Sequence, residues 1–165
     1  MKTLFIVRHA KSSWKYPELD DFERPLNKRG KKDVPVMGRF LKAKNINPDL
    51  IISSPAVRAA STARVLAEIL SYPLSRIIFD NQIYEADSES LFNIVSGLNE
   101  NVKNVILIGH NPSLTSFANT IADHFVGNIP TCGIFCTELD ISSWSEISEK
   151  CGTLKFFEFP KNISK

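Results

Sequence analysis

The chain has 165 residues, a length typical of one domain with a sizeable core. Apolar residues make up 43% and charged residues 23%, a balance that excludes a disordered chain. The formal net charge of +2 is low for a protein held to nucleic acid by charge, and no apolar run approaches the about 18 residues of a membrane span. We therefore expect one folded domain over residues 1–165 that binds neither nucleic acid nor a membrane.

Cysteine use and the first residues bear on the cellular compartment. The apolar stretch Leu4–Val7 ends at Arg8 and is too short for a secretion signal. Cys132, Cys136 and Cys151 are odd in number and form no CxxC pair, so a disulfide framework is not expected. Both features predict a cytoplasmic protein.

Two patterns alternate along the chain. Short runs of branched apolar residues predict buried strands, and apolar residues at helical spacing predict helices between them. In chain order these are a strand at Thr3–Val7, a helix after Gly30 through Met37–Lys44, a strand at Leu50–Ile52, a helix at Ala59–Leu70, a strand at Ile77–Phe79, a helix at Leu91–Leu98, a strand at Val105–Ile108 and a helix at Leu114–Ile121. This alternation predicts an α/β fold with a mostly parallel sheet and helices on both faces.

The last third of the chain changes character. Thr131–Leu139 and Thr153–Phe159 have the composition of strands, and the polar segment Ser142–Glu149 connects them. We expect antiparallel edge strands here. Phe156, Phe157 and Phe159 are expected to lie on both faces of the last strand, because successive strand residues point to opposite faces.

Two predicted strand–helix junctions carry helix-starting residues. Ser54-Pro55 follows one strand and Asn111-Pro112 follows another. Ser54 and Asn111 are favoured residue types for helix N-caps, and proline is favoured at the first helical position. Free N–H groups then point outward from the ends of parallel strands, where such sheets bind ligands and helix N-termini favour phosphate. Asn111 is therefore a candidate phosphate-binding residue.

The same strand ends carry two arginines and two of the three histidines. Arg8 and His9 follow the first strand, and His110 follows the strand Val105–Ile108. Arg58 lies in the first turn of a predicted helix, so its side chain leans back toward the strand ends. The sequence therefore predicts that these four side chains meet at one edge of the sheet.

These residue types suit phosphoryl transfer. An arginine fork matches phosphate oxygens, and a neutral imidazole can attack phosphorus to form a phosphohistidine. The second ring nitrogen of that imidazole must be held as a donor, which we expect of a backbone carbonyl. Arg8, Arg58 and a protonated His110 can stabilise the developing charge. A metal site built from His9, His110 and His124 has no HxH or HExxH spacing to support it.

At this point the motifs resemble a known family, the histidine phosphatase superfamily, and in particular its small SixA-like branch. The resemblance extends over essentially the whole chain. It rests on LFIVRHAKSSW at Leu4–Trp14, DFERPLNKRG at Asp21–Gly30, SSPAVRAASTA at Ser53–Ala63, GHNPS at Gly109–Ser113 and the last strand within Gly152–Pro160.

The resemblance implies roles for the matched positions. It implies a three-layer α/β/α sandwich of the phosphoglycerate mutase-like type, with no metal or other cofactor. His9 is implied as the nucleophile, and Arg8, Arg58 and His110 as the groups that bind and neutralise the phosphoryl group.

Many members of the superfamily also have a glutamate that protonates the leaving group. Its position corresponds to the segment Asn81–Ala86, where Glu85 is the nearest glutamate and Asp87 a second candidate, although the expected position can also fall on Gln82. Glu85 and Asp87 can equally be helix-start residues. A phosphoramidate can be protonated before attack and needs a general acid less, so a missing acid favours a phosphohistidine substrate.

The resemblance and the small size favour a phosphorylated protein as substrate, such as a histidine phosphotransfer domain. A phosphatase of small phosphomonoesters or nucleotides is the alternative, and a phospho-ligand binding domain without turnover is a third. The basic run Lys28, Arg29, Lys31 and Lys32 is either a solvated face or a docking patch for an acidic partner. Four further side chains have two interpretations: they line the pocket, or they are exposed or pack against a loop. These are Lys11, Trp14, Tyr16 and Arg24.

Overall fold

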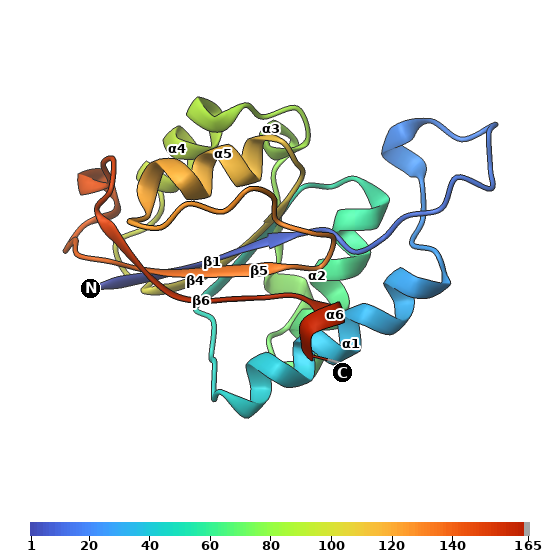
Figure 1. Cartoon of the computed structure of the whole chain (residues 1–165), viewed down its shortest axis with the longest axis horizontal. Coiled ribbons are helices and arrows are strands. Elements are labelled where there is room, and N and C mark those ends of the chain that lie inside the picture. The colour runs from blue at the N-terminus through green and yellow to red at the C-terminus, as the bar shows by residue number, and fades with distance from the viewer. Residues whose placement is uncertain (164–165) are drawn as a thin grey trace.

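A six-stranded sheet forms the middle of the molecule, in a computed structural model that describes residues 1–163 (Figure 1). The strand order is β3-β2-β4-β1-β5-β6. The strands are β1 (Lys2–Arg8), β2 (Leu50–Ser53), β3 (Ile78–Phe79), β4 (Asn104–Gly109), β5 (Ile134–Leu139) and β6 (Gly152–Glu158). β1 to β4 are parallel, and β5 pairs antiparallel with both β1 and β6, as predicted for the last third of the chain.

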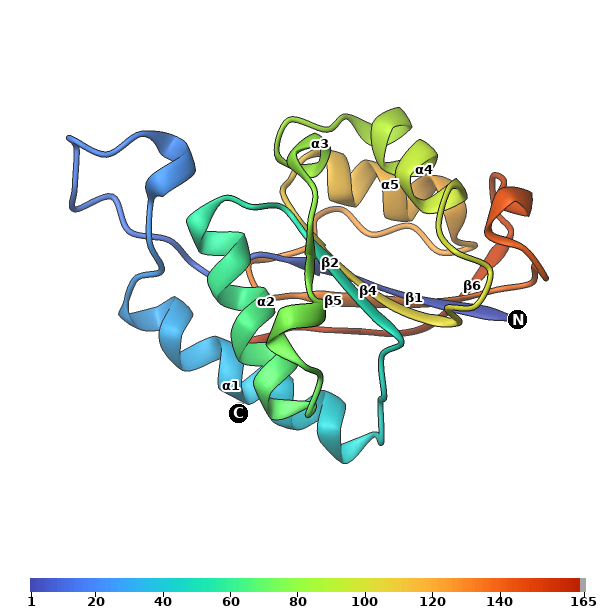
Figure 2. The ribbon, with the colours of Figure 1, turned by 180° about the vertical axis from the view of Figure 1, so that it is seen from behind.

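Helices cover both faces of this sheet, which confirms the three-layer α/β/α architecture (Figure 2). One face carries α1 (Lys28–Ala43) and α2 (Val57–Ile69), with α6 (Pro160–Ile163) beside α1. The other face carries α3 (Asn81–Tyr84), α4 (Ser88–Ser96) and α5 (Ser113–Ile121). Short 3-10 turns lie at Asp21–Glu23, Leu74–Arg76 and Trp144–Glu146. No helix within residues 1–163 has both the length and the apolar character needed to span a membrane.

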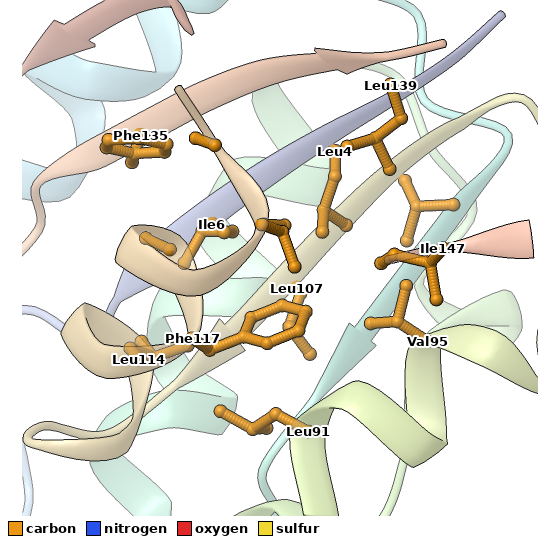
Figure 3. Close-up of a cluster of buried hydrophobic side chains, with 14 of the residues drawn as sticks. Leu4, Ile6, Leu91, Val95, Leu107, Leu114, Phe117, Phe135, Leu139 and Ile147 are labelled. Carbon is orange, nitrogen blue, oxygen red and sulfur yellow. The ribbon is translucent and has the colours of Figure 1, made fainter. Parts of the chain in front are cut away.

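The sheet separates two apolar cores because side chains alternate along each strand. Leu4 and Ile6 of β1 point toward α4 and α5, where they meet Leu107 and Phe117 (Figure 3). Phe5 and Val7, the residues between them, belong to the core under α1 and α2. The central strands are therefore apolar on both faces, and their ends are fixed firmly enough to position polar side chains.

The last strand contributes to both cores through Phe156 and Phe157, as predicted, whereas Phe159 lies just beyond the end of β6. Phe156 contacts Phe40 of α1 edge to face, with 5.3 Å between ring centroids, and Phe157 packs against Phe135 on the opposite side at 6.1 Å. The short β3 differs from its prediction. Ile77 closes a 3-10 turn, and only Ile78 and Phe79 pair, because β3 is an edge strand with one neighbour.

α1 also begins earlier than its apolar pattern predicts. Its N-cap is Asn27, whose side-chain oxygen accepts a hydrogen bond from the Gly30 N–H at 2.8 Å. Gly30 is therefore inside the first turn. A Cβ at position 30 would clash with the Lys11 carbonyl, so only glycine allows the segment after His9 to lie directly against α1.

Candidate active site

Four predicted side chains meet at the carboxyl edge of the parallel strands. Arg8 ends β1 beside Gly109 of β4, and His9 and His110 follow these two neighbouring strands. Arg58 reaches the same place from the first turn of α2 and is 5% exposed. They line a pocket of about 330 Å³ whose residues are Arg8, His9, Lys11, Ser12, Trp14, Arg24, Arg58, His110, Asn111 and Thr131.

His9 is held with one ring nitrogen paired. Its Nδ1 lies 2.7 Å from the Ala10 carbonyl oxygen, so Nδ1 is the donor and Nε2 keeps its lone pair. The expected backbone carbonyl is thus that of Ala10. Burial, together with the positive charges of Arg58 and Arg8, lowers the pKa of His9 to about 3, although the bond to Ala10 opposes this shift. The imidazole is therefore neutral and available for attack at neutral pH.

The backbone after His9 is fixed by a buried threonine. The Ala10 N–H donates to Thr62 Oγ1 at 3.0 Å, and the Thr62 hydroxyl donates to the Arg58 carbonyl at 2.8 Å. Thr62 is fully buried in α2. This bridge ties the loop that carries His9 to the helix that carries Arg58.

His110 lies beside His9 in the pocket, with 5.1 Å between ring centroids and an angle of 50° between the ring planes. Its Nε2 is 2.7 Å from Ser54 Oγ, and its Nδ1 is 3.5 Å from Arg58 Nη2. Burial and the Arg58 charge lower the pKa of His110 to about 4. The imidazole of His110 is therefore neutral in the free site at neutral pH, and the role of a protonated His110 during phosphoryl transfer stays a prediction.

Arg58 is oriented by Asp21. Its Nη1 donates to the Asp21 backbone carbonyl at 2.6 Å, and its Nη2 donates to Asp21 Oδ2 at 3.0 Å. Arg24 Nη2 approaches the other carboxylate oxygen at 3.1 Å, and the Tyr84 hydroxyl donates to Oδ2 at 2.7 Å. Although burial acts to raise the pKa of Asp21, the bonds from Tyr84, Arg58 and Arg24 lower it to about 2.

Two buried donors remain without a partner among the residues that the structure describes. They are Nε of Arg8 and Nε of Arg58. Arg8 is otherwise anchored by a bond from Nη1 to the Ile129 carbonyl at 3.2 Å. Because an unpaired buried donor is costly, these two N–H groups favour a ligand with oxygen acceptors.

Neither predicted N-cap lies directly before its helix, but Asn111 still caps α5, because its Oδ1 accepts from the Thr115 N–H in the first turn. α2 begins at Val57 after Ala56, and α5 begins at Ser113 after Pro112. Ser54 contacts His110 instead, and it also accepts a hydrogen bond from the Ala56 N–H at 3.2 Å. The side chain of Ser54 is thus used by His110 and by the loop rather than by the first turn of α2, and the expected outward N–H groups stay a prediction.

Asn111 lines the pocket, but its amide is occupied by α5 and by the segment around Ile129. Oδ1 accepts from the N–H and hydroxyl of Thr115 at 3.2 and 2.9 Å, and Nδ2 donates to the Ile129 carbonyl at 2.9 Å. Arg8 donates to the same carbonyl. These contacts support a role in shaping the loop, and the phosphate-binding role of Asn111 stays a prediction.

The candidate acids lie outside the pocket. Glu85 is exposed at the end of α3, and Gln82 is exposed within it. Asp87 is the N-cap of α4, where its side chain accepts from the Ser90 N–H at 2.8 Å. Asp87 is thus a helix-start residue. The described side chains that line the pocket include no carboxylate.

The structure shows which of the remaining candidate side chains line the pocket. Arg24 is buried and Lys11 is exposed, and both line the pocket, as does the exposed Trp14. Tyr16 lines a neighbouring hollow instead. His124 lies beyond the end of α5 and is exposed. Within the described residues, no group of three His, Cys, Asp or Glu side chains is arranged to hold a metal ion.

Sequence reasoning missed the side chains that support the site. Thr62 and Tyr84 carry no local signal, since their partners lie 52 and 63 residues away in the chain. Asp21 and Arg24 are opposite charges three residues apart, in the segment that also contains Pro25 and Leu26. This spacing is the one sequence feature that indicated an ion pair between neighbours in the chain.

The fold and the site together define an α/β protein with two imidazoles and two arginines gathered at one sheet edge. Residues 4–91 match the model of the histidine phosphatase superfamily (branch 1), and the chain belongs to this superfamily.

Relatives in sequence span most of the chain. It is 27% identical over 166 residues to an uncharacterized protein of Mycobacterium tuberculosis, covering 94% of this chain and all of that protein. It is 27% identical over 153 residues to an uncharacterized chloroplastic protein of Arabidopsis thaliana, covering 88% of this chain and 70% of that protein. A 2,3-bisphosphoglycerate-dependent phosphoglycerate mutase of Chelativorans sp. is 32% identical over 100 residues, which cover 59% of this chain and 47% of the mutase.

Solved structures confirm the fold. The protein histidine phosphatase SixA complexed with tungstate matches with a TM-score of 0.82 and 22% identity, covering 97% of this chain and 98% of that chain. SixA from Agrobacterium tumefaciens matches with a TM-score of 0.82 and 24% identity, covering 96% of this chain and 98% of that chain. A mycobacterial glucosyl-3-phosphoglycerate phosphatase complexed with VO3 matches with a TM-score of 0.69 and 14% identity, covering 94% of this chain and 98% of that chain. The expected phosphoglycerate mutase-like fold is therefore confirmed.

Proposed function

We propose that this chain is a single-domain phosphatase that works through a phosphohistidine at His9 and removes phosphate from phosphohistidine on a partner protein. Its membership of the histidine phosphatase superfamily supports phosphatase activity. The likeness to a protein histidine phosphatase supports the narrower choice of substrate.

In the first step, the lone pair on Nε2 of His9 attacks phosphorus. The Nε2–P bond forms as the bond from phosphorus to the leaving nitrogen breaks. The Nδ1–H bond to the Ala10 carbonyl holds the ring in the required tautomer. The unpaired Nε–H groups of Arg8 and Arg58 supply donors for the phosphoryl oxygens, on which negative charge is spread in the transition state.

In the second step, water attacks the phosphorus of phospho-His9. The P–Nε2 bond breaks, the imidazole regains its lone pair, and the protons of the water leave on inorganic phosphate. His110 lies beside His9 and contacts both Ser54 and Arg58. The phosphoryl group raises the pKa of His110 by adding negative charge, so the protonated form of His110, which can donate to the phosphoryl oxygens, becomes more populated as that charge develops.

The substrate class rests on one observation: no carboxylate is among the described side chains that line the pocket. A phosphomonoester loses an alkoxide, which benefits from a general acid. A phosphohistidine protonated on its second ring nitrogen leaves as neutral imidazole and needs no such acid. The pocket chemistry therefore favours a phosphoramidate.

A small phosphomonoester is the second candidate. The pocket volume of about 330 Å³ lies within the range of sites for small molecules. Glu85 is the nearest glutamate in the segment where the superfamily carries its acid, and it follows Tyr84, whose ring centroid lies 5.5 Å from that of His110.

The test compares two peptides that differ only at the phosphorylated position, which is histidine in one and serine in the other. We expect a higher kcat/KM on phosphohistidine, and no loss of that activity in Glu85→Gln. Faster turnover of phosphoserine, with a loss in Glu85→Gln, would establish the second candidate instead. Binding of inorganic phosphate without turnover of either peptide would make the chain a phospho-ligand binding domain.

A further inference from the structure

A second hollow lies beside the active-site pocket. It has a volume of about 750 Å³ and is lined by the segments 13–19 and 25–31. Its charged side chains include the basic residues Lys15, Lys28, Arg29 and Lys31, against the one acidic residue Glu18. We call this hollow the basic groove.

The basic groove and the pocket share the same walls. Lys11, Ser12, Trp14 and Arg24 face the pocket, and their chain neighbours Ser13, Lys15 and Pro25 line the groove. The two segments are held together by the Ser13 N–H, which donates to the Pro25 carbonyl at 2.8 Å. A ligand in the groove therefore lies next to a ligand in the pocket.

Trp14 stands on the wall between them. Its side chain is 78% exposed, and its indole is stacked on the Arg24 guanidinium, with 3.6 Å between the guanidinium carbon and the ring centroid. Arg24 is itself buried and fixed by Ser12 and Asp21. This anchoring presents a large apolar surface to solvent at the mouth of the pocket, where a polypeptide substrate would cross it.

The charge of the groove is concentrated at the start of α1. Lys28, Arg29 and Lys31 lie in its first turns, and the first turn contains no acidic residue. The positive end of the helix dipole disfavours cations there. Among the ion pairs of the described residues, the pair between Arg29 and Asp33 is the one that involves this cluster. An anionic partner would relieve the repulsion between these side chains.

We propose that the basic groove binds an acidic stretch of the partner protein that flanks its phosphorylated residue. The inference rests on the proposed function, because it requires a substrate carried on a polypeptide. Tyr16, Leu19 and Leu26 also line the groove, so it suits a peptide with acidic and apolar side chains.

The test uses the full chain and two phosphohistidine peptides, one with acidic and one with neutral flanking residues. In the wild type we expect the acidic peptide to have a kcat/KM about tenfold higher, mainly through KM, and this advantage should fall as salt is added. Lys28→Glu/Lys31→Glu should abolish the advantage and leave turnover of para-nitrophenyl phosphate within about twofold, since that ester does not reach the groove. Glutamate is favourable in a first helical turn, so the double variant should fold.

Lys103→Glu/Lys155→Glu is the matched control. It changes the net charge equally, and both lysines are exposed and lie outside the groove. An equal loss in this control, an unchanged preference in Lys28→Glu/Lys31→Glu, or equal turnover of the two peptides by the wild type would overturn the groove assignment. Turnover of the neutral peptide would still support the proposed function, whereas turnover of neither phosphohistidine peptide would mean that the proposed function itself is wrong.

Discussion

The carboxylate of Asp21 lies 3.0 Å from Nη2 of Arg58, although 37 residues separate the two in the chain. With the Asp21 backbone carbonyl also bound to Nη1, both terminal nitrogens of the guanidinium are engaged. The Nε of Arg58 has no partner among the described residues, and each terminal nitrogen still carries a second N–H. Asp21 therefore acts as a positioning residue: it fixes the plane of the arginine and leaves N–H donors for a phosphoryl oxygen.

Asp21→Asn tests this arrangement. The amide keeps the shape of the side chain but removes the charge, so Arg58 is held less firmly. Because half of the Asp21 side chain is exposed, we expect a loss of about 1 kcal/mol, or about fivefold in kcat/KM on an aryl phosphate. Asp20→Asn is the matched control, since Asp20 is exposed and its side chain makes no capping bond. Equal effects of the two substitutions would show that Asp21 does not position Arg58.

A second prediction concerns the threonine that supports His9. Thr62→Val keeps the volume but leaves the buried Ala10 N–H without its acceptor. We expect the free energy of unfolding to fall by about 1–3 kcal/mol, with a loss of activity. Thr62→Ser retains the hydroxyl and should be more active than Thr62→Val. Denaturant titration and kcat/KM measure the two effects, and an equally active Thr62→Val would contradict the role of this bridge.

The two buried imidazoles predict how stability depends on pH. Their pKa values are about 3 for His9 and about 4 for His110, against an ordinary value of 6.5. Below pH 6.5 the unfolded chain therefore binds more protons than the folded chain, so stability falls as the pH is lowered toward 4. We expect the free energy of unfolding to drop by at least about 1 kcal/mol between pH 7 and pH 5. A double variant His9→Gln/His110→Gln should show a shallower dependence, and an identical slope would mean that these imidazoles are not the cause.

The strands and the four central site residues could be predicted because their signals are local. A short apolar run such as Val105–Ile108 indicates a buried strand, and the residue after such a strand must lie at the sheet edge. Arg8, His9 and His110 follow from that rule alone. The helix starts could not be predicted as well, because Ser54 has two uses: the residue type favours an N-cap, but in the fold it contacts His110.

The supporting residues are beyond local reasoning for a physical reason. Tyr84 meets Asp21 only after α3 and the Asp21–Glu23 turn have been placed by the rest of the chain. The segment around Glu85 likewise gives no indication of which side chains face the pocket. Whether an acidic residue can serve as a proton donor depends on tertiary packing, and here the glutamate is exposed at the end of α3.

The central claim is that the phosphoryl group passes through His9, and trapping that group tests it most directly. Wild type, His9→Ala and the control His124→Ala would be mixed with a phosphohistidine peptide in EDTA, quenched in alkali and analysed by mass spectrometry. We predict that wild type and His124→Ala release phosphate and carry an acid-labile phosphoryl group on His9, and that His9→Ala does neither. Phosphate release by His9→Ala, or loss of wild-type activity in EDTA, would contradict the claim.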